Sequence, residues 1–303
     1  MKRIFFFLFV VGGALLIAFN AGDLIPRLHM PRQIGLTALV VTILFQGIFW
    51  LTLSLTWVTL LDEVAATRIS LWYAFCQQAI VSLGKYFPGK VWGMIARGGQ
   101  MHVSGMDLAA VAKVTYLEQL FLLHSGVVLS GALALGIYDD GPVRLLAFLA
   151  VLSAPLAALL HERILKAFIA VLRKIWSGGG TAEVAQITAA GYLRFLSGYG
   201  LAWLVSGCVF AGIYVAFIDG TLTAPLLAVL ILANAVGIWM GFVAFFAPGG
   251  IGVREAASIA VLLPFMPLEH AVMLSLLSRV WLMLMDAVSG LAALWSFRGG
   301  KGE

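Results

Sequence analysis

Charged residues are scarce in this chain. Only 11% of its 303 residues are Asp, Glu, Lys or Arg, whereas 62% are hydrophobic and the mean hydropathy is +1.03. A soluble protein of this length cannot bury so much apolar surface, and several apolar runs exceed the roughly 18 residues that indicate a membrane-spanning helix. Barrel strands alternate polar and apolar residues, so continuous apolar runs exclude a barrel. The composition predicts an all-α polytopic membrane protein.

The usual catalytic and cofactor motifs are also absent. The chain contains no GxxxxGK[ST], no HExxH, no Cys/His cluster and no GxSxG, so we expect no cofactor, no metal ion, no catalytic residue and no enzymatic activity. The two cysteines, Cys76 and Cys208, fall in apolar segments and are typical of small core residues. The net charge of +5 comes from scattered residues rather than a basic tail, which argues against a nucleic-acid partner.

Two long apolar stretches are interrupted by Pro-Gly. Ile69–Met101 contains GKYFPGK, and Leu222–Phe265 contains APGGIGVRE; each has the form helix, break, short helix. Such breaks are typical of the discontinuous or re-entrant helices of transporters. We therefore predict two broken, re-entrant hairpins, together with six full spans: Ile4–Gly22, Ile34–Leu60, Val111–Ile137, Pro142–Leu160, Tyr192–Ile218 and Leu268–Trp295.

The distribution of basic residues predicts the orientation. With the N-terminus inside and both hairpins re-entrant, eleven Lys and Arg lie on the cytoplasmic side and three outside (Arg27, Arg32 and Arg144). This asymmetry satisfies the positive-inside rule and predicts cytoplasmic termini. If one broken stretch crossed fully, the C-terminus would lie outside. Met1-Lys2-Arg3 resembles a signal-peptide start, but we expect the segment that follows to be retained as a first span, in the inner membrane of a bacterium.

The chain is expected to form one integral membrane domain, 1–303, with an internal repeat. Halves at about 34–137 and 192–296 are joined by 138–191, and the two Pro-Gly breaks are 160 residues apart. On the predicted topology the repeat is inverted, a plan that places a transporter site at the midplane. Within the joining segment, 164–176 has an apolar stripe and basic residues beside it. It is expected to lie on the cytoplasmic surface or to extend the preceding span.

Cations surround both breaks. GGIGVRE offers free backbone N–H groups at a helix start, followed by an arginine, and both features bind phosphate. The alternatives are a loop at the interface for Arg254-Glu255 and lysines that snorkel to the interface. We predict a substrate-binding set of Lys85, Lys90, Glu118, Arg254, Glu255 and Arg279, and a structural or hinge set of Pro88, Gly89, Pro248, Gly249, Gly250 and Gly252.

Two opposite charges occupy corresponding places in the repeat. Glu118 follows Pro88 by 30 residues and Arg279 follows Pro248 by 31. Arg279 lies about 16 Å into its span, where an unpaired arginine costs on the order of 3 kcal/mol. We expect Glu118 to be its partner, with Glu255 as the second candidate; the pair would either belong to the site or only join the halves. Arg97 is expected at the membrane interface.

PGGIGVRE after an apolar span, a preceding PGK break and an acidic residue in the next span resemble the lysylphosphatidylglycerol synthase transmembrane-region family, also called flippase-like domain proteins. The resemblance covers nearly the whole chain. It implies an integral membrane domain of inverted repeats that moves lipids or lipid-linked saccharides between leaflets. Members that synthesise the lysyl-lipid carry a large soluble transferase domain after the membrane part. This sequence ends at Glu303, so the resemblance argues against synthase activity.

These observations favour a transporter that moves an anionic, phosphate-containing lipid or lipid-linked saccharide between leaflets, with the lipid head group and the bilayer as partners. Two alternatives stay open. One is a membrane enzyme of lipid or glycan assembly that uses a polyprenyl-phosphate substrate, with Glu118 or Glu255 as the base. The other is a non-transporting membrane subunit whose partner is a lipid or glycan synthase.

Overall fold

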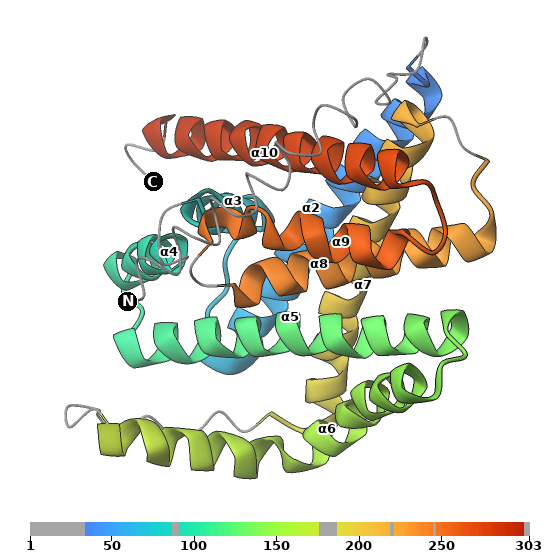
Figure 1. Ribbon diagram of the computed structural model, residues 1–303. Coiled ribbons are helices and arrows are strands. Elements are labelled where there is room, and N and C mark those ends of the chain that lie inside the picture. Colours follow the sequence, from blue (N-terminus) through green and yellow to red (C-terminus); the bar gives the residue numbers. More distant parts are fainter. Residues whose placement is uncertain (1–33, 87–90, 176–186, 219–220, 245–246, 300–303) are drawn as a thin grey trace, which may run out of the picture.

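The computed structural model describes residues 34–86, 91–175, 187–218, 221–244 and 247–299, and every regular element in these ranges is helical. The predicted first span, Ile4–Gly22, lies outside them. Figure 1 labels the elements: α2 (Leu36–Ala65), α3 (Leu71–Gly84), α4 (Trp92–Val103), α5 (Leu108–Ile137), α6 (Gly141–Ile175), α7 (Ala189–Phe217), α8 (Ala224–Val243), the 3₁₀ turn η2 (Pro248–Gly250), α9 (Val253–Leu262) and α10 (Leu268–Gly299).

Hydroxyl side chains cap the N-termini of three of these helices. Ser70, Thr188 and Thr223 each accept a hydrogen bond from a backbone N–H three residues on, at the starts of α3, α7 and α8. Such caps satisfy N–H groups that have no partner within the helix.

Among the described residues, six helices are long and apolar enough to cross a membrane. They are Leu36–Ala65, Ala110–Ile137, Gly141–Leu160, Ala189–Phe217, Ala224–Val243 and Leu268–Ser296. Large apolar side chains cover their outer faces; Leu44, Leu159 and Trp295, for example, are 61%, 75% and 83% exposed. Such a surface is stable against lipid tails but not in water. The prediction of an all-α polytopic membrane protein is confirmed.

Two parts of the expected topology can be compared with the described helices. The stretch Ala224–Val243, which we assigned to the second broken segment, is itself long enough to be a span. The basic segment 164–176 does not begin a separate helix, because α6 is continuous from Gly141 to Ile175. A continuous helix agrees with both interpretations, an extension of the preceding span and a stretch on the cytoplasmic surface. α6 bends along its course in Figure 1, and the Pro155 within it removes one backbone hydrogen bond.

Both Pro-Gly breaks connect helices that pack against each other as hairpins, α3 with α4 and α8 with α9. Glycines allow the close approach. A side chain on Gly84 would overlap the backbone of Gly93, and a Cβ on Gly250 would lie 2.8 Å from the Gly241 Cα. Small residues at such contacts let helix backbones approach in membranes.

The helices α2 and α7 form the long central contact of the molecule. The Gly35 N–H at the start of α2 donates to the Ala216 carbonyl near the end of α7 (3.1 Å), and Glu63 near the end of α2 pairs with Arg194 near the start of α7. The two helices are therefore antiparallel. In Figure 1 they run across α5, α8, α9 and α10.

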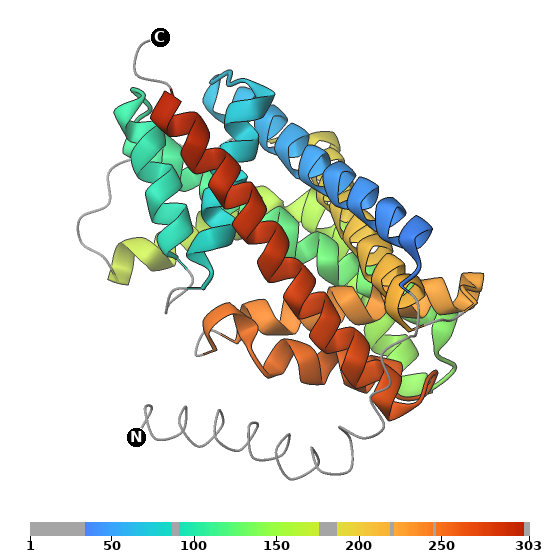
Figure 2. The same cartoon turned by 90° about the horizontal axis from the view of Figure 1, so that it is seen from above.

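The buried apolar residues form two main clusters, one toward each end of the antiparallel α2–α7 pair. The first surrounds Trp57 and Phe121, and the second surrounds Phe210 and Leu274. Figure 2 shows α10 lying across one face, with α3 and α4 near its C-terminal end and α8 and α9 near its N-terminal end. This position lets a single helix contact both breaks.

Candidate functional site

The second break is a turn that requires glycine. Gly249, Gly250 and Gly252 have φ angles of 58°, 72° and 82°, a region that other residues adopt only with strain. The turn ends where Glu255 caps α9, because its Oε2 accepts a hydrogen bond of 2.7 Å from the Gly252 N–H. The unusual sequence PGGIG is thus explained by backbone geometry.

Arg279 of α10 holds this turn in place. Its Nη1 donates to the Gly249 carbonyl at 2.7 Å and lies 3.6 Å from the Glu255 Oε1. Its Nη2 is buried and has no hydrogen-bond partner among the described residues. The guanidinium is therefore bonded on one side and has spare donor capacity on the other.

The two breaks meet at the same place. The Gly249 N–H donates to the Lys85 carbonyl at 3.0 Å, so the backbones of the two hairpins are hydrogen-bonded to each other. The Lys85 Nζ lies 2.7 Å from the Asp286 Oδ2, and the Tyr86 hydroxyl donates to the same oxygen at 2.5 Å. Because Asp286 follows Arg279 by seven residues, about two helical turns, one face of α10 contacts both breaks.

Arg254 is the third cation beside the two breaks. It is 8% exposed, and among the described residues its guanidinium makes no hydrogen bond and no ion pair. Among the described residues the nearby charges are three cations (Lys85, Arg254 and Arg279) against two acids (Glu255 and Asp286), which leaves one excess positive charge when all are ionised. A buried excess charge is energetically unfavourable in an apolar environment and attracts an anion.

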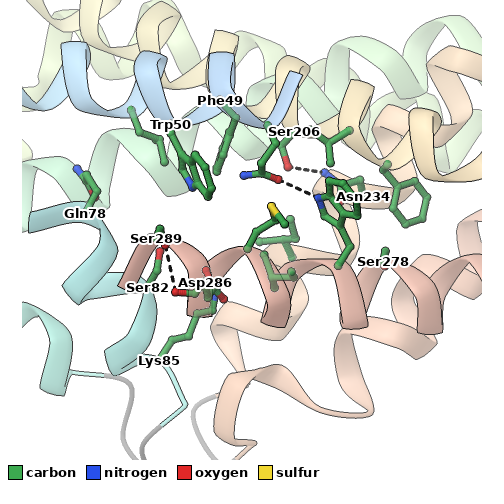
Figure 3. A pocket seen from close by; sticks show the side chains of 18 of the residues that line it. Phe49, Trp50, Gln78, Ser82, Lys85, Ser206, Asn234, Ser278, Asp286 and Ser289 are labelled. Carbon is green, nitrogen blue, oxygen red and sulfur yellow. Dashed lines mark hydrogen bonds and ion pairs between the residues drawn. The ribbon is translucent and has the colours of Figure 1, made fainter. Parts of the chain in front are cut away.

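A cavity of about 200 Å³ opens beside these residues, between α2, α3, α7, α8 and α10. Lys85, Arg254, Gly249 and Asp286 line it, and aromatic and aliphatic side chains, including Phe49 and Trp50, form much of its wall. Figure 3 shows Lys85 and Asp286 at one side of this space. Pockets for drug-sized ligands measure about 300–1,000 Å³, so this cavity is sized for a smaller group.

The predicted Glu118–Arg279 pair is not formed. Glu118 instead binds Arg97 of α4 through two hydrogen bonds, Nη1 to Oε1 at 3.0 Å and Nη2 to Oε2, and Gln78 donates to Oε1 at 2.8 Å. Our second candidate, Glu255, is the acid beside Arg279. The sequence alone could not choose between them, because it does not give the distances between helices.

Arg97 was also expected at the interface, and this is wrong. Its side chain is fully buried, with the guanidinium carbon 3.9 Å from the centre of the Trp57 ring. The carboxylate of Glu118 and the aromatic face together stabilise a charge that apolar surroundings alone would exclude.

The structure brings together Lys85, Arg254, Glu255 and Arg279 of the predicted set. Glu118 lies apart from the cavity lining, and Lys90, Pro88 and Gly89 lie outside the described residues. Sequence reasoning missed Asp286, Gln46 and Asn234 as cavity residues. The signal was available, since each is a polar residue inside an apolar helix, and such residues commonly face a site.

No family model matches this sequence, and no curated protein matches it significantly. The fold and the site define the class: an integral membrane protein with a charged cavity among its apolar helices.

Proposed function

We propose that this protein moves an anionic, phosphate-containing lipid or lipid-linked saccharide between bilayer leaflets. The observation that carries the proposal is Arg254, a buried guanidinium without a partner that lines a cavity together with Lys85. Arginine forms paired hydrogen bonds to phosphate oxygens. A phosphate group in the cavity would supply the missing partner, while the lipid tails would remain among the apolar helix faces.

The energetic argument favours a ligand over a purely structural role. An unpaired arginine at the centre of a bilayer costs on the order of 3 kcal/mol. Arg97 and Arg279 offset this cost through Glu118, Glu255 and the Gly249 carbonyl. Arg254 makes no hydrogen bond or ion pair within the described residues, and the nearby acids Glu255 and Asp286 already bind other groups, so a bound anion would stabilise the protein as well as be recognised by it.

Helix packing supports the proposed internal repeat. The proposed repeat pairs α2 with α7, α3 with α8, α4 with α9 and α5 with α10. If this pairing is correct, a contact between α3 and α10 should be matched by a contact between α8 and α5. Both contacts are present. The ion pairs also correspond under this pairing, with the positions of the basic and the acidic residue exchanged. In the first half Arg97 of α4 binds Glu118 of α5, and in the second half Glu255 of α9 faces Arg279 of α10.

The direction of the helices supports inversion. Within this pairing α2 and α7 are antiparallel, as an inverted repeat requires. The cavity between the halves would then be reached from either leaflet as the halves rock. We propose further that both hairpins are re-entrant and that both termini lie in the cytoplasm of a bacterial cell.

The test is leaflet exchange in proteoliposomes with fluorescent phosphatidylglycerol, followed by chemical quenching of the outer leaflet. Arg254→Gln should slow exchange at least about tenfold, since a charge-assisted hydrogen bond contributes about 1.5–3 kcal/mol. Arg254→Lys, which keeps the charge but loses the paired bonds, should be intermediate. The matched control is Arg68→Gln, because Arg68 lies on the surface and binds only the exposed Asp62.

Normal exchange by Arg254→Gln would reject the site, and absence of exchange by the unchanged protein would reject transport of this lipid. Covalent turnover of polyprenyl-phosphate substrates by the pure protein would favour the enzyme alternative. A stoichiometric partner without any lipid exchange would favour the subunit alternative.

A further inference from the structure

The cavity has a second polar region, separate from the cations at the breaks. Gln46 of α2, Ser206 of α7, Asn234 of α8, and Ser278 and Trp281 of α10 all line it. Figure 3 shows Ser206, Asn234 and Ser278 on one side of the cavity and Ser82, Lys85, Asp286 and Ser289 on the other. We call Gln46, Ser206, Asn234, Ser278 and Trp281 the amide cluster. None of its members is charged.

Gln46 and Asn234 are only 5% and 3% exposed, and both lie within helices long enough to span the membrane. Burying an amide without hydrogen bonds is unfavourable, because the group loses its hydrogen bonds to water. Both amides are partly satisfied. The Trp281 Nε1 donates to the Gln46 Oε1 at 3.1 Å, and the Asn234 Nδ2 donates to the Ser206 Oγ at 2.9 Å.

These bonds leave one donor group and one acceptor without partners. Indole N–H groups only donate, so the Trp281 bond fixes the Gln46 oxygen and leaves the Gln46 Nε2 available. The Asn234 Oδ1 likewise has no hydrogen-bond partner among the described residues. A hydroxyl group both donates and accepts, and therefore complements this combination.

The two polar regions contact α10 at different levels, Gln46 through Trp281 and Lys85 through Asp286. Trp281 and Asp286 are five residues apart on α10, which is about 7.5 Å along the helix axis. Phosphate oxygens hydrogen-bond within about 3 Å of their donors. A bare phosphate at Lys85 and Arg254 would leave the amide cluster without a ligand.

We infer that the cavity recognises a phosphate ester whose head group extends into a neutral, hydroxyl-bearing group, with the phosphate on Lys85 and Arg254 and the hydroxyls on Gln46 and Asn234. The inference rests on the proposed function only in assigning the phosphate to the cationic end. A glycerol or a sugar would supply this chemistry. An ammonium-bearing head group would not, because the amide cluster has no acid.

The test measures binding rather than transport, so it can succeed or fail independently of lipid exchange. The full-length protein in nanodiscs is titrated with glycerol 3-phosphate, glucose 1-phosphate, phosphoethanolamine and inorganic phosphate. At least one of the two hydroxyl-bearing esters should bind about tenfold more tightly than inorganic phosphate, the effect of about one net hydrogen bond. The tighter of the two identifies a glycerol or a sugar as the source.

Gln46→Met and Asn234→Leu should each abolish this preference and leave the affinity for inorganic phosphate unchanged. Thr52→Val is the control, because the Thr52 hydroxyl binds only the Ile48 carbonyl of its own helix. Two variants in different helices, each checked by size-exclusion chromatography, guard against loss of the fold at one position.

Equal affinity for all phosphate compounds would overturn the inference, as would preserved preference in both variants or tightest binding of phosphoethanolamine. If the hydroxyl preference is found but no lipid is exchanged, the inference stands and the transport proposal fails. If lipid is exchanged but the hydroxyl preference is absent, the transport proposal stands and this inference fails.

Discussion

Removal of one charge from the Arg97–Glu118 pair should strongly destabilise the protein. The pair is almost completely excluded from solvent, with side chains 0% and 4% exposed. Breaking a buried ion pair by removing one partner costs about 3–5 kcal/mol, because the other charge is left unpaired in an apolar environment. We therefore expect Glu118→Gln and Arg97→Met each to lower the free energy of unfolding by about this amount.

The double variant should cost much less than the sum of the two. Replacing both members of a buried pair by residues of similar volume is often nearly neutral. Some loss remains, since Arg97→Met also removes the contact with the Trp57 ring, which contributes up to about 2 kcal/mol when desolvated. A coupling energy of about 3 kcal/mol is therefore expected for Arg97 and Glu118.

The measurement is a double-mutant cycle in mixed micelles, with SDS-induced unfolding followed by tryptophan fluorescence. A second cycle, Glu118→Gln with Arg279→Met, should be additive within about 0.5 kcal/mol, because distant sites without shared partners do not couple. Arg68→Met is a surface control expected to cost no more than about 1 kcal/mol. Coupling between Glu118 and Arg279, with additivity between Arg97 and Glu118, would refute the pairing described above.

Three further predictions concern the cavity and the second break. Gly249→Ala should lower stability by about 1–3 kcal/mol, because its φ of 58° strains any other residue; chemical unfolding measures the loss, and an unchanged curve would contradict the turn geometry. Gly237→Val should destabilise more, by about 3 kcal/mol or more, since even a Cβ would overlap the Ser258 Oγ; wild-type stability would mean that α8 and α9 do not pack closely. Asp286→Asn should tighten inorganic phosphate binding about tenfold in titrations, because it releases Lys85 from an ion pair of 2.7 Å; weaker binding would mean that the pair itself builds the site.

Tertiary contacts decided which charges bind each other. Glu118 and Arg279 occupy corresponding sequence positions, and this symmetry suggested that they pair. The helix packing instead joins Glu118 to Arg97 of the short helix α4 and Arg279 to Glu255 of the short helix α9. Position in a repeat indicates equivalence, whereas pairing depends on the distance between two side chains in space.

The sequence by itself determined the class of the protein and the place of the breaks. Apolar runs of span length leave a polytopic helical membrane protein as the only stable arrangement, since backbone groups in lipid must be satisfied within helices. The second Pro-Gly pair lies where the structure has its turn, at Pro248–Gly250. Only the tertiary structure joined the two breaks through Gly249 and Lys85 and placed Arg254 in the wall of a cavity. Burial and partner choice arise from contacts between helices far apart in the chain, and local residue patterns carry no information on those distances.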